Sequence, residues 1–214
     1  MDHEQDRDQG PPGGGVAGQL QAPGQDPVPA PDPPEAAAPR KARIGTCWLD
    51  GCSGCHMSLL DMDEAIVDVL ARADIVFGPL VDAQEWPAGV DVAVIEGAVS
   101  SQDDLHLLTE ARERSRILVA LGDCAVTGNV PTMRNRIPTR ALLERVYVEG
   151  ADEQGQIPTD GVPPLLRQAE PLHAHVKVDV HVPGCPPSAD SILYTISELL
   201  EGRLPDLGSR QRFG

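Results

Sequence analysis

Short apolar runs rich in β-branched residues, separated by longer stretches of helical periodicity, constrain the fold of this chain more than any other feature. Strands that alternate with helices indicate a parallel sheet covered on both faces, because each return connection has to cross the sheet. We therefore predict an α/β protein with a flavodoxin-like, doubly wound parallel sheet. The expected strands are ARIGTCWL (42–49), ADIVFG (73–78), VDVAVIEG (90–97), RILVALGDC (116–124) and KVDVHVPGC (177–185).

The segments between these strands predict helices where apolar residues recur at intervals of three and four. The second helix should begin at a serine cap followed by acids in its first turn, and the last should end at Gly202. Stretches with many prolines and turn residues predict loops instead. The expected helices are 56–73, 101–115, 139–148 and 188–202, and the expected loops are 123–140 and 149–172.

Residues 1–40 differ in composition from the rest of the chain. They hold nine of the 21 prolines and seven acidic residues against two basic ones, which gives −5 of the formal charge of −16. Such a segment buries too little apolar surface to offset the loss of chain entropy. We expect residues 1–40 to be a disordered tail and residues 41–214 to form one domain.

The charge and hydropathy of the chain exclude several classes of function. A net charge of −16 is unsuited to nucleic acid or to anionic lipid, because both are bound mainly through basic side chains. No apolar run approaches the roughly 20 residues that span a bilayer, and no secretion signal is evident. We expect a cytoplasmic protein that binds neither nucleic acid nor membrane. Cysteines in that compartment are more often ligands or redox groups than disulfides.

Four of the five cysteines follow expected strands. Cys52 and Cys55 come after the first strand, Cys124 after the fourth and Cys185 after the fifth. Because the carboxyl ends of parallel strands meet at one edge of the sheet, we expect these four thiols to converge. Four thiolates suit a 4Fe–4S cluster or a zinc ion, and the Cys-x-x-Cys pair alone would also suit a redox dithiol. Cys47 lies within the first strand and is expected to be a buried, inert thiol.

Glycines and prolines beside the cysteines support a ligand role. Gly54 lets the backbone curl closely around a bound metal, because it has no Cβ atom. Gly184 precedes Cys185, and Pro186 follows it directly, which makes a stiff loop that would fix one ligand. The sequence therefore predicts a metal site at the carboxyl edge of the sheet.

Motifs in order along the chain also resemble those of a known family, the small subunit of nickel–iron hydrogenases. The greatest similarity is to the cytoplasmic, bidirectional, NAD-reducing type. The small subunit of respiratory complex I is a more distant relative, since its first motif has adjacent cysteines where Ser53 and Gly54 separate the pair here. The motifs are WLDGCSGCHMSLLDMDE (48–64), VIEGAVS (94–100), LGDCAVTGNVPTMRN (121–135) and PGCPPS (183–188).

The resemblance implies one proximal 4Fe–4S cluster as the cofactor of this chain. Glu96 and Gly97 would lie near that cluster and near the subunit interface, with Gly54 and Gly184 also beside it. Glu96 is equally well interpreted as an acid that only closes a strand. The implied ligands are Cys52, Cys55, Cys124 and Cys185.

The resemblance also implies the partners. A hydrogenase large subunit would carry the Ni–Fe centre, and a diaphorase module would carry FMN, further iron–sulfur clusters and the NAD site. This chain would relay electrons between them and would not be catalytic alone. A different acceptor, such as a deazaflavin or heterodisulfide module, stays open, as do a zinc-stabilised scaffold and a metal-free dithiol oxidoreductase.

Overall fold

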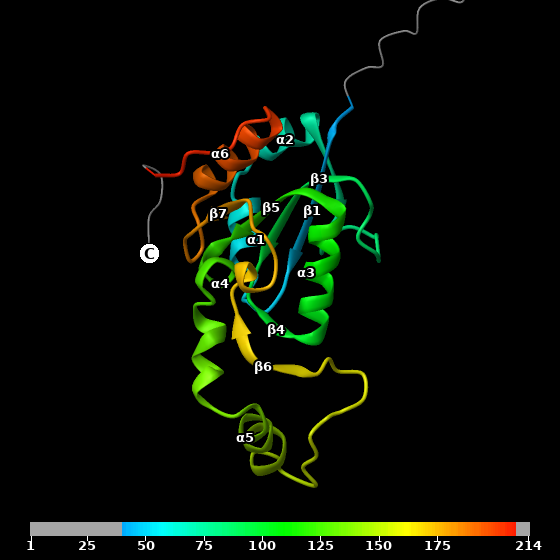
Figure 1. Cartoon of the computed structure of the whole chain (residues 1–214), viewed down its shortest axis with the longest axis vertical. Helices are drawn as coiled ribbons and strands as arrows, with labels where there is room; N and C mark the ends of the chain where they lie inside the picture. The colour runs from blue at the N-terminus through cyan, green and yellow to red at the C-terminus, as the bar shows by residue number, and fades with distance from the viewer. Residues whose placement is uncertain (1–39, 209–214) are drawn as a thin grey trace, which may run out of the picture. The chain divides into compact units, whose positions relative to one another are not determined.

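The computed structural model of the chain describes residues 40–208 (Figure 1). The predicted tail therefore lies outside the described residues except for Arg40, and so does the end of the predicted domain after residue 208.

The described part contains a five-stranded sheet in which every pair of neighbours is parallel. The strand order β2-β1-β3-β5-β7 is the flavodoxin-like order, so the predicted fold class is confirmed. The order reverses between β1 and β3, and ligands of open α/β sheets bind outside the carboxyl ends at such a point. The strands are β1 (Ala42–Trp48), β2 (Ala73–Phe77), β3 (Val90–Glu96), β5 (Ser115–Leu121) and β7 (Val180–Val182).

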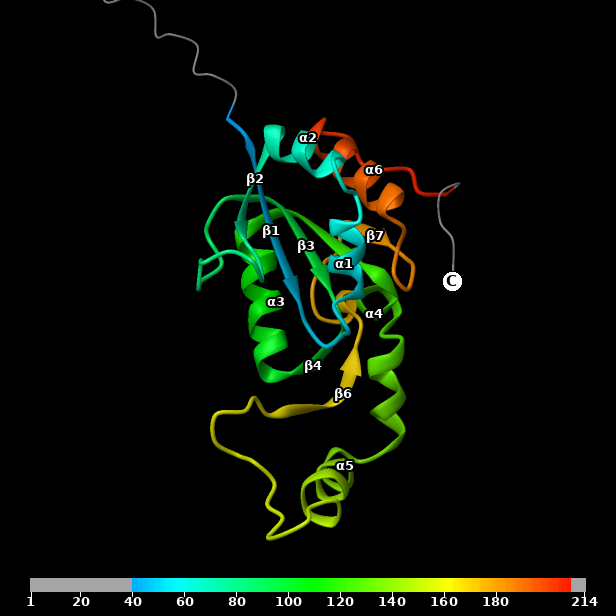
Figure 2. The same cartoon turned by 180° about the vertical axis from the view of Figure 1, so that it is seen from behind.

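Helices cover both faces of the sheet, as Figures 1 and 2 show from opposite sides. One buried cluster joins the sheet to Leu59, Val69 and Ile192 from three helices. The other joins the opposite face to Leu108 of α3 and to Trp86. The helices of the first face are α1 (Gly54–Leu60), α2 (Ala65–Arg72) and α6 (Ala189–Leu200), and that of the second is α3 (Gln102–Arg114).

The start of α3 confirms the predicted serine cap. The Ser101 hydroxyl accepts a hydrogen bond from the Asp104 backbone N–H, and the Asp104 carboxylate accepts one from the Ser101 N–H. This reciprocal pair satisfies two N–H groups that the helix itself cannot satisfy.

The predicted single helix over residues 56–73 is wrong, because the structure forms α1 and α2 with a turn between them. The first helix ends at Leu60, and Asp63, at φ 49°, takes a left-handed conformation in the turn before α2. The apolar stripe is divided accordingly. Leu59 and Met62 are buried in the core, whereas Met57 and Leu60 are 60% and 44% exposed.

Two regions expected to be loops contain regular structure. The first, 123–140, forms the short helix α4 and a 3₁₀ helix, η1, and the second, 149–172, contains strand β6. Strand β6 pairs with β4 in a separate antiparallel ladder, where the Asn135 side chain exchanges two hydrogen bonds with Ala169. The bounds are α4 (Gly122–Thr127), η1 (Val130–Arg136), α5 (Thr139–Glu144), η2 (Arg145–Glu149), β4 (Val99–Ser101), β6 (Leu165–Glu170) and η3 (Leu172–Ala174).

Candidate metal centre

The structure brings together the four cysteines that follow strands. They line one small cavity, of about 80 Å³, at the carboxyl edge of the sheet. Glu96, Gly97, Gly54 and Gly184, the other site residues named from the sequence, line the same cavity. Cys47 does not line it, and its side chain is buried inside β1. The cysteines at the cavity are Cys52, Cys55, Cys124 and Cys185.

Hydrogen bonds of Asp123 tie the loops of the two distant cysteines to each other. The Asp123 carboxylate accepts from the Gly184 N–H at 2.7 Å, and the Asp123 N–H donates to the Gly184 carbonyl at 2.9 Å. Because Asp123 precedes Cys124 and Gly184 precedes Cys185, this pair of bonds fixes the spacing of two thiols that are 61 residues apart. The sequence analysis missed Asp123, whose only signal was its place beside a cysteine.

The Cys-x-x-Cys loop is attached to its neighbours in the same way. Asp50 and Ala98 exchange backbone hydrogen bonds of 3.0 and 2.8 Å, which join this loop to the end of β3. On the other side, the Ser58 hydroxyl donates to the carbonyl of Pro187 at 2.5 Å. The loops that carry the thiols are therefore preorganised by contacts between segments far apart in the sequence.

Glycines are required where backbone segments and a thiol pack closely beside the cavity. A Cβ atom added to Gly122, at φ 83°, would lie 2.2 Å from the sulfur of Cys55. One on Gly97, at φ 88°, would lie 2.8 Å from the carbonyl carbon of Leu49. Non-glycine residues are strained at such positive φ angles and would also clash with these atoms.

Glu96 does more than close a strand, because its carboxylate is buried and hydrogen-bonded. The side chain is 2% exposed, and Oε2 accepts from the His56 backbone N–H at 2.7 Å. The same oxygen lies 2.5 Å from His56 Nδ1, and His56 Nε2 is buried without a hydrogen-bond partner. The Trp48 ring packs edge-on against the imidazole at 5.4 Å between centroids. Sequence reasoning missed His56, for which an adjacent cysteine was the only signal.

The electrostatics of the cavity disfavour free thiolates. Burial, together with the charges of Glu96 and Cys124, raises the pKa of Cys55 to about 12. Burial and the charge of Cys185 likewise raise the pKa of Cys124. A reactive dithiol needs a thiol of lowered pKa, so this environment argues against that alternative for Cys55. A cationic metal centre would favour the thiolate form, and four cysteine side chains are the usual ligands of a 4Fe–4S cluster.

Among residues 40–208, no group of three or more His, Cys, Asp or Glu side chains is arranged to hold a metal ion.

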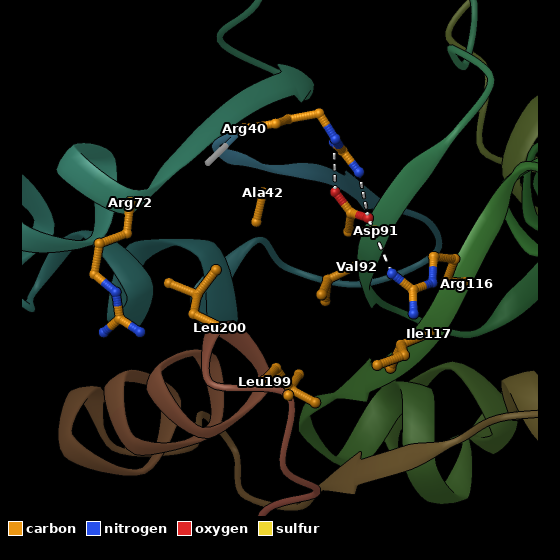
Figure 3. A pocket seen from close by; sticks show the side chains of 10 residues that line it. Arg40, Ala42, Arg72, Asp91, Val92, Arg116, Ile117, Leu199 and Leu200 are labelled. Carbon is orange, nitrogen blue, oxygen red and sulfur yellow. Dashed lines mark hydrogen bonds and ion pairs between the residues drawn. The ribbon is translucent and has the colours of Figure 1, made fainter. Parts of the chain in front are cut away.

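A second cavity, of about 390 Å³, lies at the opposite edge of the sheet and has a different chemistry (Figure 3). The Asp91 carboxylate accepts two hydrogen bonds from the guanidinium of Arg40, at 2.9 and 3.0 Å, and lies 3.5 Å from Arg116. Burial alone would raise the pKa of Asp91, but the hydrogen bonds from Arg40 and from the Arg43 N–H hold it below its ordinary value. No cysteine lines this cavity. Asp91 pairs there with Arg40 and Arg116, while the lining residue Arg72 lies 3.9 Å from Glu201.

None of the helices within residues 40–208 combines the length and the apolar character needed to cross a bilayer.

The chain matches the family model of the NADH ubiquinone oxidoreductase 20 Kd subunit over residues 52–199, and it belongs to that family. The matched region contains all four cysteines at the cavity.

Similar proteins are subunits of hydrogenases. One subunit of the F420-non-reducing hydrogenase vhu from Methanocaldococcus jannaschii is 39% identical over 78% of this chain and 59% of its own length. The delta subunit of the NAD-reducing hydrogenase HoxS from Cupriavidus necator is 36% identical over 82% of this chain and 88% of its own. The chain thus spans little more than half the length of the F420-non-reducing relatives.

Among solved structures, a chain of an NAD⁺-reducing [NiFe]-hydrogenase in the H₂-reduced state superposes with a TM-score of 0.79. It is 36% identical, and the match covers 82% of this chain and 100% of that one. The resemblance to a hydrogenase small subunit, stated from the motifs, is confirmed.

Proposed function

We propose that this chain is the electron-transfer subunit of a nickel–iron hydrogenase, and that it holds one 4Fe–4S cluster as its proximal centre. The observation that carries the proposal is the glycine-lined cavity, around which separate loops place four cysteine side chains. The proposed ligands are Cys52, Cys55, Cys124 and Cys185.

When bound, the cluster would supply one-electron redox chemistry that protein side chains cannot provide. The residues of this chain hold, orient and shield it. Asp123 fixes the Cys124 and Cys185 loops at a set separation, and Gly122 leaves room for the sulfur of Cys55. The buried Glu96 carboxylate orients the start of α1 through the His56 N–H, so that the Cys55 ligand is preorganised.

Apolar side chains exposed beside the cavity support a partner at this edge. Met57 of α1 is 60% exposed and Trp48 43% exposed, while Val130 and Met133 of η1 are 60% and 73% exposed. Exposed apolar residues gathered around a functional site are typical of protein–protein contact surfaces. In the proposal, the large subunit with its Ni–Fe centre covers this surface and brings that centre within electron-transfer distance.

The proposed acceptor is a diaphorase module that carries FMN and NAD, which would place the complex in the cytoplasm. Support comes from the similarity to the HoxS delta subunit and to the chain of the NAD⁺-reducing hydrogenase, whose whole length is matched. The similarity to the F420-non-reducing enzymes keeps a second candidate, a hydrogenase that delivers electrons to a different acceptor module.

The test is an anaerobic affinity purification of the chain from its host, followed by metal, labile-sulfide and activity assays. We expect a nickel-containing large subunit to co-purify, with iron and acid-labile sulfide on this chain, and hydrogen to reduce NAD. If hydrogen reduces an artificial dye but not NAD, the second candidate acceptor replaces the first. A chain that carries zinc without sulfide and has no partner would refute the electron-transfer function.

A further inference from the structure

Beyond the four cysteines, the turn after the Cys124 helix donates hydrogen bonds to two of them. The side-chain amide of Asn129 lies with Nδ2 3.5 Å from the sulfur of Cys185. The backbone N–H of the next residue, Val130, donates to Cys124. Two adjacent residues therefore supply one donor each to sulfurs that come from different loops.

The backbone of this turn is held in an uncommon conformation. Asn129 has φ 32° and ψ −125°, one of three positive-φ residues other than glycine in the described part of the chain. Its carbonyl accepts from both the Thr132 N–H, at 3.2 Å, and the Thr132 hydroxyl, at 2.7 Å. The preceding residue, Gly128 at φ 87°, closes α4 with a hydrogen bond to the Cys124 carbonyl at 3.0 Å. Surrounding contacts are needed to maintain such a strained residue, and strained residues are concentrated at functional sites.

Hydrogen bonds to the sulfurs of an iron–sulfur cluster are one of the factors that set its reduction potential. A donor near a thiolate stabilises negative charge, and the reduced cluster carries one more negative charge than the oxidised one. A donor therefore favours the reduced form and makes the cluster a stronger electron acceptor.

We propose that Asn129 is a positioning residue that raises the reduction potential of the cluster by donating its amide N–H to Cys185. The inference rests on the proposed function, because it requires a cluster at the four cysteines. It assigns to the Gly128-Asn129-Val130 turn a role in electron transfer that is separate from ligand binding.

The experiment is a potentiometric titration, followed by electron paramagnetic resonance, of the anaerobically purified hydrogenase complex. The signal of this cluster is the one that disappears in Cys124→Ser. In Asn129→Gly, whose backbone accepts φ 32° without strain, we expect full iron content and a midpoint potential below that of the wild type. Asn129→Ala, which removes the amide without adding a charge, should also lower the midpoint potential and replaces the glycine variant if that one does not assemble.

Asn135→Ala is the matched control. Asn135 belongs to the same η1 segment, but its amide donates to the Ala169 carbonyl, so its loss should lower stability and leave the potential unchanged.

An intact cluster with an unchanged potential in Asn129→Gly would overturn the inference and leave the proposed function standing. Equal shifts in Asn129→Gly and Asn135→Ala would also overturn it, since general loosening would then explain both. The absence of any signal that depends on the four cysteines would refute the proposed function, and the inference with it.

Discussion

The two edges of the central sheet are built from the same strands but use opposite kinds of interaction. At the carboxyl edge, backbone hydrogen bonds, glycines and one buried carboxylate, Glu96, organise four thiols around a small cavity. At the amino edge, Asp91 pairs with Arg40 and Arg116, whose side chains are 62% and 80% exposed.

The difference leads us to expect that the two edges respond differently to substitution. Exposed ion pairs are screened by water and contribute little free energy. A preorganised cavity is sensitive to single atoms, because neither its backbone nor its glycines can adjust without loss of neighbouring contacts. Substitutions at the carboxyl edge should therefore abolish a bound group, whereas substitutions at the amino edge should change the free energy of unfolding only slightly.

The largest expected effect is the loss of the metal centre in Cys185→Ser. A hydroxyl is a poor replacement for a thiolate ligand, so the purified complex should lose the iron and labile sulfide that this chain carries. The matched control is Cys47→Ala, because Cys47 is buried in β1 away from the cavity, and it should retain both. Retained iron in Cys185→Ser, or lost iron in Cys47→Ala, would contradict the ligand assignment.

A single methyl group should have nearly as large an effect at Gly122. Its Cβ atom would lie 2.2 Å from the Cys55 sulfur, so Gly122→Ala is expected to displace that ligand and lower the iron content severalfold. Gly161 offers a matched control at φ 71°, because a Cβ atom there meets nothing within 4 Å. Gly161→Ala should cost only about 1 kcal/mol of backbone strain and leave the iron in place. Equal iron loss in both variants would show that strain at a positive φ angle, and not the contact with the Cys55 sulfur, causes the loss.

Much of this organisation follows from the sequence, because strand polarity is a global constraint that short patterns reveal. The β-branched runs predict the parallel sheet, and the polarity of the sheet alone predicts that Cys124 and Cys185 lie near the Cys-x-x-Cys pair. The tertiary contacts that fix the site are different. Asp123 binds Gly184 and Glu96 binds the His56 N–H, and neither pairing has a periodic signal in the sequence.

The errors of secondary-structure prediction have the same cause. Strand β6 lies between Pro164 and Pro171 in a segment whose prolines predict a loop. It pairs only with β4, and the Asn135 side chain bonds it in place. The helix break at Asp63 was missed, because no proline or glycine marks it and the apolar spacing continues through the turn. Where a long-range contact decides the local conformation, local patterns are insufficient.

A moderate effect is expected when the buried carboxylate at the carboxyl edge is removed. Glu96→Ala leaves the His56 N–H without its acceptor, which should lower the free energy of unfolding by about 1–3 kcal/mol. Glu96→Gln keeps an acceptor oxygen in the same place, so it should lower the free energy of unfolding by less than Glu96→Ala does. Urea denaturation of the complex and its variants measures the difference. If Glu96→Ala were as stable as the wild type, the carboxylate would not hold the start of α1.

The smallest effect belongs to the amino edge and depends on pH. Because the pKa of Asp91 is held below its ordinary value in the folded chain, its ionised form stabilises the fold above pH ~4, the usual carboxylate pKa, and this contribution is lost as the pH falls through the folded pKa. Asp91→Asn should therefore be less stable than the wild type at pH 7 by less than about 1 kcal/mol, with the gap closing in acid. Urea denaturation of the chain prepared without iron, at pH 7 and at pH 3, measures this gap. A gap that stayed constant over this range would mean that Asp91 acts through its shape and hydrogen bonds. The contrast between an amino edge of screened ion pairs and a preorganised carboxyl edge would then lose its electrostatic basis.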